Sequence, residues 1–166
     1  MAQGYIRAAD LPQAIPLFPL PGAILLARGQ LPLNVFEPRY LNMVDDAMGG
    51  DRLIGMIQPA GGPDDRPRLS PVGCAGRITG FAETSDGRYL ITLTGICRFR
   101  LVSELAVRSP YRQARVDFTP FQADLSAPGD GSDPFPRPAL FDALRAYLET
   151  RGLDIGQFMP LLVDIL

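Results

Sequence analysis

Hydrophobic and polar positions at the start of the chain repeat with the two-residue period of strands. Residues 1–12 show no such pattern and are expected to form a loose leader. Residues 15–20 alternate proline with apolar side chains, which predicts a short edge strand or an extended lead-in segment, because each proline removes a ladder hydrogen bond. The apolar run at 23–27 predicts a short buried strand, and the alternation over 30–36 predicts another strand with one apolar face.

The period changes to that of a helix at Pro38. Proline suits the first helical turn, where its missing N–H costs nothing, and Glu37 lies where the positive end of the helix dipole favours a carboxylate. The apolar residues that then recur at helical spacing are Tyr40, Leu41, Val44, Ala47 and Met48. The intervening polar residues face water, and the two glycines at 49–50 are the expected end of the helix.

The most distinct pattern in the chain is a hairpin over residues 72–102. A strand at 52–57 and a loop rich in Pro and Gly at 59–67 precede it, and its turn is the Ser-Asp-Gly-Arg sequence at 85–88, where Gly supplies a positive φ. The positions expected on its inner face are Cys74, Gly76, Ile78, Gly80, Ala82, Ile91, Leu93, Gly95, Cys97 and Phe99. Thr and Arg occupy the opposite face, so the ribbon is half-buried, and the inner glycines predict the sharp bend of a small closed barrel.

The C-terminal part of the chain changes from strands to helices. A last strand is expected over 112–119, and residues 122–137, rich in Asp, Pro and Gly, read as a linker. The inward positions of that strand are Ala114, Val116 and Phe118. An amphipathic helix follows, which ends at Gly152, and a second helix begins near Leu153. The apolar residues of the first helix are Leu140, Phe141, Leu144, Tyr147 and Leu148. These segments cannot bury their apolar faces alone. We therefore expect residues 138–166 to be the first part of a helical subdomain that is truncated in this sequence, rather than helices docked on the barrel.

The composition removes several classes of chemistry. The chain has no His, and Arg supplies all 16 of its basic residues, so it has no Lys either. Without His it lacks the base of Ser-His-Asp and Cys-His systems and the imidazole ligand of zinc sites. Without Lys it lacks the Schiff-base amine and the phosphate-binding loop that ends in Gly-Lys-Ser/Thr. Carboxylates remain for a glycosidase-like pair, but we expect no enzyme, no metal and no cofactor.

Charge and cysteine content bear on the setting of the protein. The net charge of −2 leaves no electrostatic footprint for nucleic acid or an anionic membrane. The uncharged run at 14–27 is interrupted by prolines and is too short to span a membrane. Cys74 and Cys97 do not suggest a disulfide framework; they could approach each other across the hairpin, close enough for a redox bridge, or remain buried free thiols, as a reducing compartment favours. A cytoplasmic setting is expected.

Several stretches together resemble the N-terminal, substrate-binding domain of Lon proteases. They are residues 15–20, 31–40, 73–78, 95–100 and 110–111. They follow the order of the family, and the Phe-Glu-Pro-Arg-Tyr sequence at 36–40 is the most specific of them. The resemblance implies a mainly β fold with α, a PUA-like pseudobarrel of about six strands plus one helix over residues 13–121, followed by a C-terminal helical region.

The resemblance also bears on function. Lon proteases add an ATPase with a phosphate-binding loop and a protease with a Ser-Lys dyad, neither of which a chain without Lys can hold. The chain therefore resembles a stand-alone bacterial member of the family. The implied role is a non-enzymatic protein-binding module that recognises exposed or unfolded polypeptide, or acts as an adaptor for a protease system. An RNA-binding PUA-like domain is one alternative, disfavoured by the net charge of −2, and a structural or oligomerisation module is another; DNA and membrane partners are not expected.

The candidate binding residues come from two regions of the predicted barrel. They are Leu31, Leu33, Phe36, Glu37, Arg39, Tyr40, Arg98 and Arg100. If the edge of the 30–36 strand is open, an extended peptide could add to it through main-chain hydrogen bonds; otherwise its apolar residues fill the barrel. Residues 37–40 either face a ligand or only begin the helix. Arg98 and Arg100 either bind an anion or a backbone carbonyl, or lie on a solvated face of the sheet.

Overall fold

The computed structural model describes residues 4–126 and 137–153. The chain divides into two compact units, Met1–Ser126 and Ala127–Leu166, and each is described by itself. The first unit contains the sheet, and the described part of the second contains the helix α2 (Arg137–Thr150).

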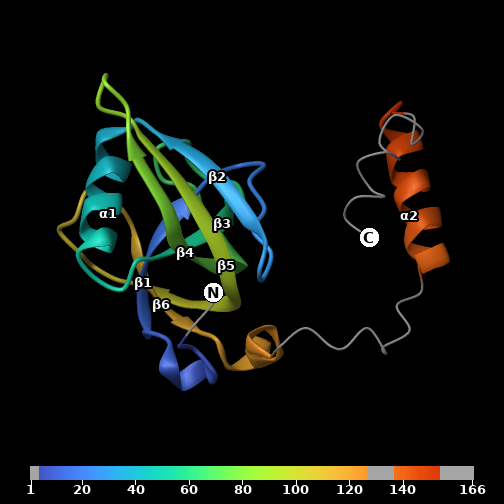
Figure 1. The fold of residues 1–166 in the computed structure, drawn as a ribbon, viewed down its shortest axis with the longest axis horizontal. Coiled ribbons are helices and arrows are strands. Elements are labelled where there is room, and N and C mark those ends of the chain that lie inside the picture. The colour runs from blue at the N-terminus through green and yellow to red at the C-terminus, as the bar shows by residue number, and fades with distance from the viewer. Residues whose placement is uncertain (1–3, 127–136, 154–166) are drawn as a thin grey trace. The chain divides into compact units, whose positions relative to one another are not determined.

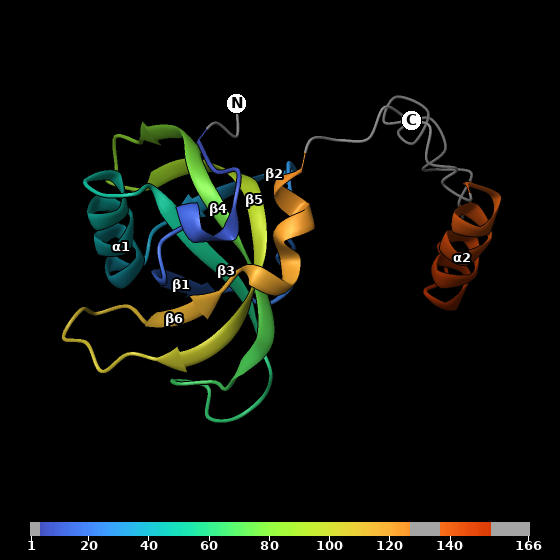
Figure 2. The same cartoon turned by 90° about the horizontal axis from the view of Figure 1, so that it is seen from below.

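The first unit is a six-stranded sheet that curls on itself, accompanied by α1 and two short 3-10 helices in the described residues (Figures 1 and 2). The strands are β1 (Ala14–Pro19), β2 (Gln30–Val35), β3 (Leu53–Pro59), β4 (Leu69–Glu83), β5 (Tyr89–Glu104) and β6 (Gln113–Asp117). The helical segments are η1 (Ala8–Asp10), α1 (Pro38–Met48) and η2 (Thr119–Leu125). The long strand β5 pairs with β4, with β2 over its first residues and with β6 over its last.

The strand order closes a ring. The sheet runs β2-β5-β4-β3-β1-β6, and β6 returns to pair with β5, so β5, β4, β3, β1 and β6 enclose a core while β2 extends the sheet at one side. Strands β1 and β3 run parallel, and the other pairs are antiparallel. The predicted pseudobarrel, mainly β with an α-helix, is confirmed.

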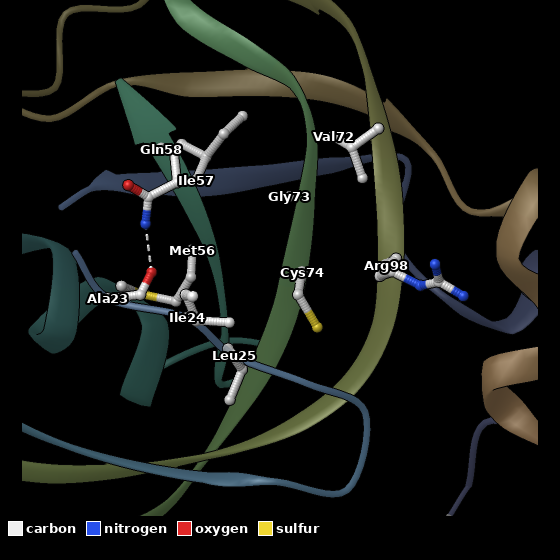
Figure 3. Close-up of a pocket in the computed structure, with 10 residues that line it drawn as sticks. All are labelled: Ala23, Ile24, Leu25, Met56, Ile57, Gln58, Val72, Gly73, Cys74 and Arg98. Carbon is white, nitrogen blue, oxygen red and sulfur yellow. Dashed lines mark hydrogen bonds between the residues drawn. The ribbon is translucent and has the colours of Figure 1, made fainter. Parts of the chain in front are cut away.

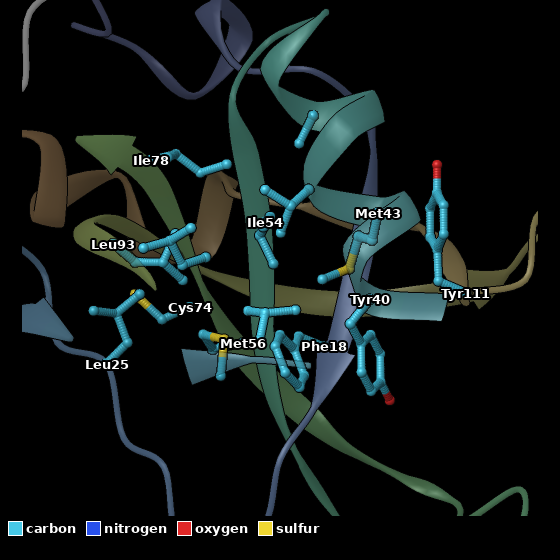
Figure 4. Close-up of a cluster of buried hydrophobic side chains, with 14 residues drawn as sticks. Phe18, Leu25, Tyr40, Met43, Ile54, Met56, Cys74, Ile78, Leu93 and Tyr111 are labelled. Atoms are coloured by element: carbon cyan, nitrogen blue, oxygen red, sulfur yellow. The ribbon is translucent and has the colours of Figure 1, made fainter. Parts of the chain in front are cut away.

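Two hydrophobic clusters lie on the two faces of the strands. The first packs the buried side of α1, including Met43 and Val44, against strand residues such as Ile54 (Figure 4). The second gathers residues such as Phe99 and Val116 with apolar residues of η1 and η2. Strand β3 is buried on both faces because its alternate residues belong to the two clusters.

Local signals in the sequence are confirmed where they are strongest. Helix α1 has the predicted bounds, with Pro38 in its first turn and Gly49 directly after its end. It also buries Met43, which the sequence pattern did not single out. The turn between β4 and β5 has Gly87 at φ +82°. Strand β6 buries Ala114 and Val116 as predicted, and Phe118, directly after the strand, is buried as well.

The prediction of a buried strand at 23–27 is wrong. The segment is an irregular loop in which Leu25 is 6% exposed, while Ile24 and Leu26 beside it are 73% and 67% exposed. The backbone carbonyl of Leu26 lies directly over Gly95, where the Cβ of any other residue would overlap it. The loop therefore crosses a glycine of β5 at close range instead of pairing as a strand.

The hairpin of β4 and β5 forms as predicted, but its expected inner face is correct only in part. The pairing shifts between Ile78 and Gly80, where β4 has one extra residue, and such a bulge exchanges the two faces of β4 beyond it. Ala82, expected inside, consequently lies opposite Leu90 and is exposed.

A second shift in the pairing separates the two cysteines. Ala75 lies opposite Cys97, and Cys74 lies opposite Arg98, so the two thiols belong to opposite faces of the hairpin. Both cysteines are buried and free. Burial raises the pKa of Cys74 to about 12 and that of Cys97 to about 11, which keeps both thiols protonated. The interpretation as buried free thiols is confirmed, and the redox bridge is wrong.

Two segments expected to be loose pack onto the barrel. Leu11, in the expected leader, is buried in the second cluster together with neighbours of η1. Residues 122–125, at the start of the expected linker, belong to η2, and Phe121 and Leu125 pack against the same cluster. The apolar residues of both segments are isolated and do not repeat with the period of a helix or strand, so the sequence pattern did not predict their burial.

The second unit is described through α2. This helix covers the residues predicted to be helical, and Gly152 follows it at φ +67°, a conformation that suits glycine at a helix end. The further helix expected from Leu153 onward lies outside the described residues. No helix in the part of the chain that the structure describes is long and apolar enough to cross a membrane.

Candidate functional site

Strand β2 forms an edge of the sheet, because among the described strands it pairs with β5 alone. Leu31 and Leu33 are half-buried and pack against the first cluster, the one under α1, so these two candidate residues contribute to the hydrophobic core. Phe36, directly after the strand, is 64% exposed. The apolar side chains of the strand itself are thus mostly turned inward, and what it offers a partner is its backbone.

The free edge of β2 offers fewer hydrogen bonds than an ordinary strand. Bonded positions begin at Gly29, whose carbonyl accepts the Gly95 N–H at 2.8 Å, and they recur at every second residue. The alternate residues, Pro32 among them, therefore turn their backbone groups to the free edge. Proline has no N–H, so the middle of the edge presents only an acceptor. Addition of a peptide strand at β2 stays a prediction.

The two candidate arginines each face a carboxylate. Nε and Nη2 of Arg98 donate to the two carboxylate oxygens of Asp124, both at 2.9 Å. The Arg98 guanidinium also lies 4.7 Å from the centre of the Phe121 ring. Arg100 pairs with Asp117 at 3.5 Å. Arg98 therefore fastens η2 to β5, and both guanidinium charges are already balanced within the domain.

An apolar pocket of about 170 Å³ opens between the 23–27 loop and the strands β3 and β4 (Figure 3). Its lining residues are Ala23, Ile24, Leu25, Met56, Ile57, Gln58, Val72, Gly73, Cys74 and Arg98. Of these only Arg98 is charged, and its guanidinium points away from the others (Figure 3). Ile24 is exposed at the rim, and so is Val72, at 41%. We call this the apolar pocket.

Gln58 fastens one wall of the apolar pocket. Its Oε1 accepts the Gly22 N–H at 3.2 Å, and its Nε2 donates to the Leu20 carbonyl at 3.3 Å. The same nitrogen donates to the Ala23 carbonyl, the bond drawn in Figure 3. One side chain thus holds both ends of the turn that leads into the loop, so the pocket is formed before anything binds.

A larger pocket of about 440 Å³ borders the same turn. Its lining residues are Phe18, Pro19, Leu20, Pro21, Glu37, Arg39, Tyr40, Pro59, Gly61, Gly62, Pro63, Asp64, Asp65, Pro67 and Arg112. It unites the candidates Glu37, Arg39 and Tyr40 with a loop at 61–67 that sequence reasoning did not connect to them. We call this the charged pocket.

Tyr40 lies at the base of the charged pocket. Its ring stacks on Phe18, with 4.2 Å between the ring centres, and the Arg39 guanidinium lies 4.7 Å from the centre of the Tyr40 ring. Arg39 in turn pairs with Glu37 at 3.0 Å. Tyr40 is only 7% exposed, and its hydroxyl points away from the first cluster (Figure 4). Burial raises the pKa of the Tyr40 hydroxyl, so at neutral pH it is both a hydrogen-bond donor and an acceptor.

The family described as the ATP-dependent protease La (LON) substrate-binding domain matches residues 14–155. The chain belongs to this family. The resemblance inferred from the sequence is confirmed, and the Phe-Glu-Pro-Arg-Tyr element at 36–40 supplies part of the charged pocket in this substrate-binding domain.

The relatives of this substrate-binding domain include Lon proteases. The chain is 32% identical to Lon protease 2 of Myxococcus xanthus over 117 residues, which cover 69% of this chain and 14% of that protein. It is 28% identical to Lon protease of Syntrophus aciditrophicus over 159 residues, 90% of this chain and 19% of that protein. The chain thus spans less than a fifth of the length of these relatives.

Solved structures show the same fold. A Lon N-terminal domain protein from Xanthomonas campestris aligns with a TM-score of 0.56 and 25% identity, covering 82% of this chain and 73% of that one. The N-terminal domain of Lon protease from the Mycobacterium avium complex aligns with a TM-score of 0.58 at 13% identity, covering 92% of this chain and 75% of that one.

Sequence reasoning missed most of the apolar pocket. The sequence pattern places Ile24 and Leu25 in a buried strand, and it does not single out Val72 or Gln58. A signal was present: Pro21-Gly22 followed by an uninterrupted apolar run is also what an apolar surface loop looks like. A buried strand and an apolar surface loop are distinguished here only by the close approach of residues 23–27 to glycines of β4 and β5.

Replacing Asp124 with asparagine is expected to lower the free energy of unfolding by about 1 kcal/mol at pH 7, since Arg98 is half exposed and its charge is partly screened. The Arg98 guanidinium holds the pKa of the Asp124 carboxyl below its usual range. A lowered carboxyl pKa stabilises the fold above the unfolded-state value, about 4, and this contribution is lost as the pH falls through the folded-state value.

Urea titrations of both proteins between pH 7 and pH 2 measure this contribution. The wild type and Asp124→Asn should differ at pH 7 and at pH 5 and converge below about pH 4. A difference that stays constant down to pH 2 would contradict the assignment to the Asp124 charge.

Proposed function

We propose that this domain is a non-enzymatic recognition module that binds exposed or unfolded polypeptide, alone or as an adaptor for a protease system. The observation that carries the proposal is the apolar pocket with exposed Ile24 and Val72 at its rim, in a domain of a substrate-binding family. Convergent apolar surface beside a preformed hollow is the usual form of a binding site.

The size of the apolar pocket suits one apolar side chain of a bound chain. Met56 and Cys74 are buried residues of its lining, and the raised pKa of Cys74 makes that thiol an apolar surface rather than a nucleophile. Burial of a single large apolar side chain contributes about 1.5–3 kcal/mol, which gives weak binding by itself. Weak binding with little sequence preference is what a module that samples many unfolded chains requires.

A charge at the rim of the apolar pocket is expected to weaken this binding. Val72→Asp would place a carboxylate where an apolar side chain must enter, and we expect the dissociation constant to rise about tenfold, or ~1.4 kcal/mol. The measurement is fluorescence anisotropy with a labelled, permanently unfolded polypeptide at about 0.15 M salt.

The matched control for this experiment is Val102→Asp. Val102 is also an exposed valine of the barrel, on β5, but it does not line the apolar pocket. Equal weakening by both substitutions would argue against a specific pocket. A parallel titration with single-stranded RNA checks the alternative, and binding of RNA without polypeptide would replace the proposal.

A further inference from the structure

We propose that the seating of η2 on the barrel regulates how tightly the apolar pocket binds polypeptide. This regulation rests on the proposed function, because it controls the same site. The segment η2 ends at Leu125, and the chain passes from the first unit to the second after Ser126. A displacement of the chain beyond Ser126 therefore reaches η2 before any other element of the barrel.

Two arginines beside the apolar pocket hold η2. Arg98 lines the pocket, directs its guanidinium away from it (Figure 3), and donates to both carboxylate oxygens of Asp124 at 2.9 Å. Arg28, at the end of the loop that lines the pocket, donates from Nη1 to the carbonyls of Asp124 and Ser126, both at 3.2 Å. Asp124 is thus bonded both to a strand of the barrel and to the loop of the pocket. We call η2 seated when these bonds are made and released when they are broken.

The loop depends on Arg28 at one end and on Gln58 at the other. Gln58 holds residues 20–23 through the three hydrogen bonds described above. Arg28 adopts φ +66°, which costs a residue with a side chain energy that its contacts must offset. Those contacts are its backbone bond to the Gly95 carbonyl and its two side-chain bonds to η2. Release of η2 therefore loosens the loop that carries Ile24 to the pocket.

The attachment of η2 itself is modest. Its apolar contacts with the second cluster come from Phe121 and Leu125, which are only partly buried. Phe121 departs from helical geometry at φ −118°, so η2 consists of two short turns rather than one continuous helix. Short 3-10 turns are weak on their own, and a surface segment of this kind opens at a lower free energy than the sheet beneath it. Segment η2 can thus be released while the barrel stays folded.

Binding and seating must then favour each other. When the released state holds the polypeptide more weakly by some factor, bound polypeptide shifts η2 toward the seated state by the same factor. We expect a factor of about five, because release removes two hydrogen bonds from the loop and no side chain from the pocket.

The first test measures hydrogen exchange in the full chain without polypeptide. Leu125→Ala removes an apolar contact of η2, and Leu125 does not line the apolar pocket. The N–H groups of Arg28 and Gly29, both bonded within or next to the loop, should exchange about threefold faster in this variant. The Gly87 N–H, in the turn between β4 and β5, is the internal reference and should exchange at the wild-type rate.

The second test measures polypeptide binding by fluorescence anisotropy, as for Val72→Asp. Arg28→Asn removes the guanidinium bonds to η2 and retains a residue type that tolerates positive φ, so the dissociation constant should rise about fivefold. The matched control is Arg52→Asn, since Arg52 is also an exposed arginine at positive φ, +59°, and lies outside the pocket. This control should bind as the wild type does.

The third test measures the reverse effect. In the wild type, saturating polypeptide should slow the exchange of the Phe121 and Ser126 N–H groups of η2 about fivefold. Weaker binding by Arg28→Asn without this slowing would show that Arg28 acts on the loop alone, and it would overturn the regulation by η2.

The remaining outcomes distinguish the two proposals. Unchanged exchange of the loop in Leu125→Ala, or wild-type affinity in Arg28→Asn, would overturn the regulation and leave the proposed function intact. Failure of the wild type to bind the polypeptide would overturn the proposed function, and the regulation of binding with it.

Discussion

Replacing Phe99 with alanine is expected to lower the free energy of unfolding by about 3–5 kcal/mol, the range for a large buried aromatic side chain. Phe99 is fully buried in the second cluster, and its ring meets that of Phe118 edge to face, with 6.1 Å between the ring centres. The truncation removes apolar burial and an aromatic contact and leaves a cavity.

The surroundings of Phe99 keep that cavity open. Its ring lies over two glycines of neighbouring strands: a Cβ built on Gly73 would come 2.6 Å from the Phe99 Cζ, and one on Gly55 would come 3.0 Å from it. Strand backbones joined in a closed ring cannot move inward to fill the space that the ring vacates. We therefore expect a value in the upper half of the range.

Chemical denaturation of the variant measures this effect, with Phe36→Ala as the control. Phe36 is 64% exposed, so its truncation should change the free energy of unfolding by less than about 0.5 kcal/mol. The sharper check is Gly55→Ala, whose Cβ meets Ile15 and Leu17 in both backgrounds and crowds the Phe99 ring only in the wild type, while it partly fills the cavity in Phe99→Ala. Its cost should be smaller in the variant background, and strictly additive costs would show that the ring does not rest on Gly55.

The parts of the fold that the sequence predicted depend on local signals. Helix α1 begins at Pro38 because the constraint on its backbone and the helical spacing that follows both act within a few residues. The turn at Gly87 needs a positive φ, which glycine adopts freely. No such signal marks the bulge near Gly80, because it depends on how two strands fit a curved sheet. The face of β4 beyond it was therefore predicted the wrong way round, whereas Ile91 of β5 is buried as expected.

The residues of the candidate sites likewise differ in whether a local signal identifies them. The sequence singled out Glu37, Arg39 and Tyr40, and all three line the charged pocket, because a motif is contiguous by nature. It could not supply their neighbours, the aspartates at 64–65, which another loop brings to the same opening. For Arg98 it could not supply the partner that balances the charge, since η2 reaches that strand only in the folded chain. Sequence patterns identify the side chains with chemistry, and tertiary packing decides which remain free to use it.

The inner-face glycines were expected to bend the sheet, and the structure gives Gly95 a more specific role. The Leu26 carbonyl lies where a side chain at position 95 would begin, and Gly95 exchanges hydrogen bonds with the same loop, donating to the Gly29 carbonyl and accepting the Arg28 N–H at 2.7 Å. Arg28 adopts φ +66° there, which costs a non-glycine residue energy that the contact must offset. The position of the loop that lines the apolar pocket thus depends on the absence of a side chain at Gly95.

Gly95→Ala is therefore expected to lower the free energy of unfolding by about 3 kcal/mol, because either the loop or the strand must move to admit a methyl group. Urea titration measures it, and polypeptide binding should weaken as well, since displacement of Leu26 carries Ile24 and the pocket wall with it. The control is Gly49→Ala, at φ −78°, where a Cβ would meet nothing closer than 3.6 Å and alanine should be neutral or slightly stabilising. Equal stability of the two variants would mean that the loop yields freely, and the pocket could then not be preformed.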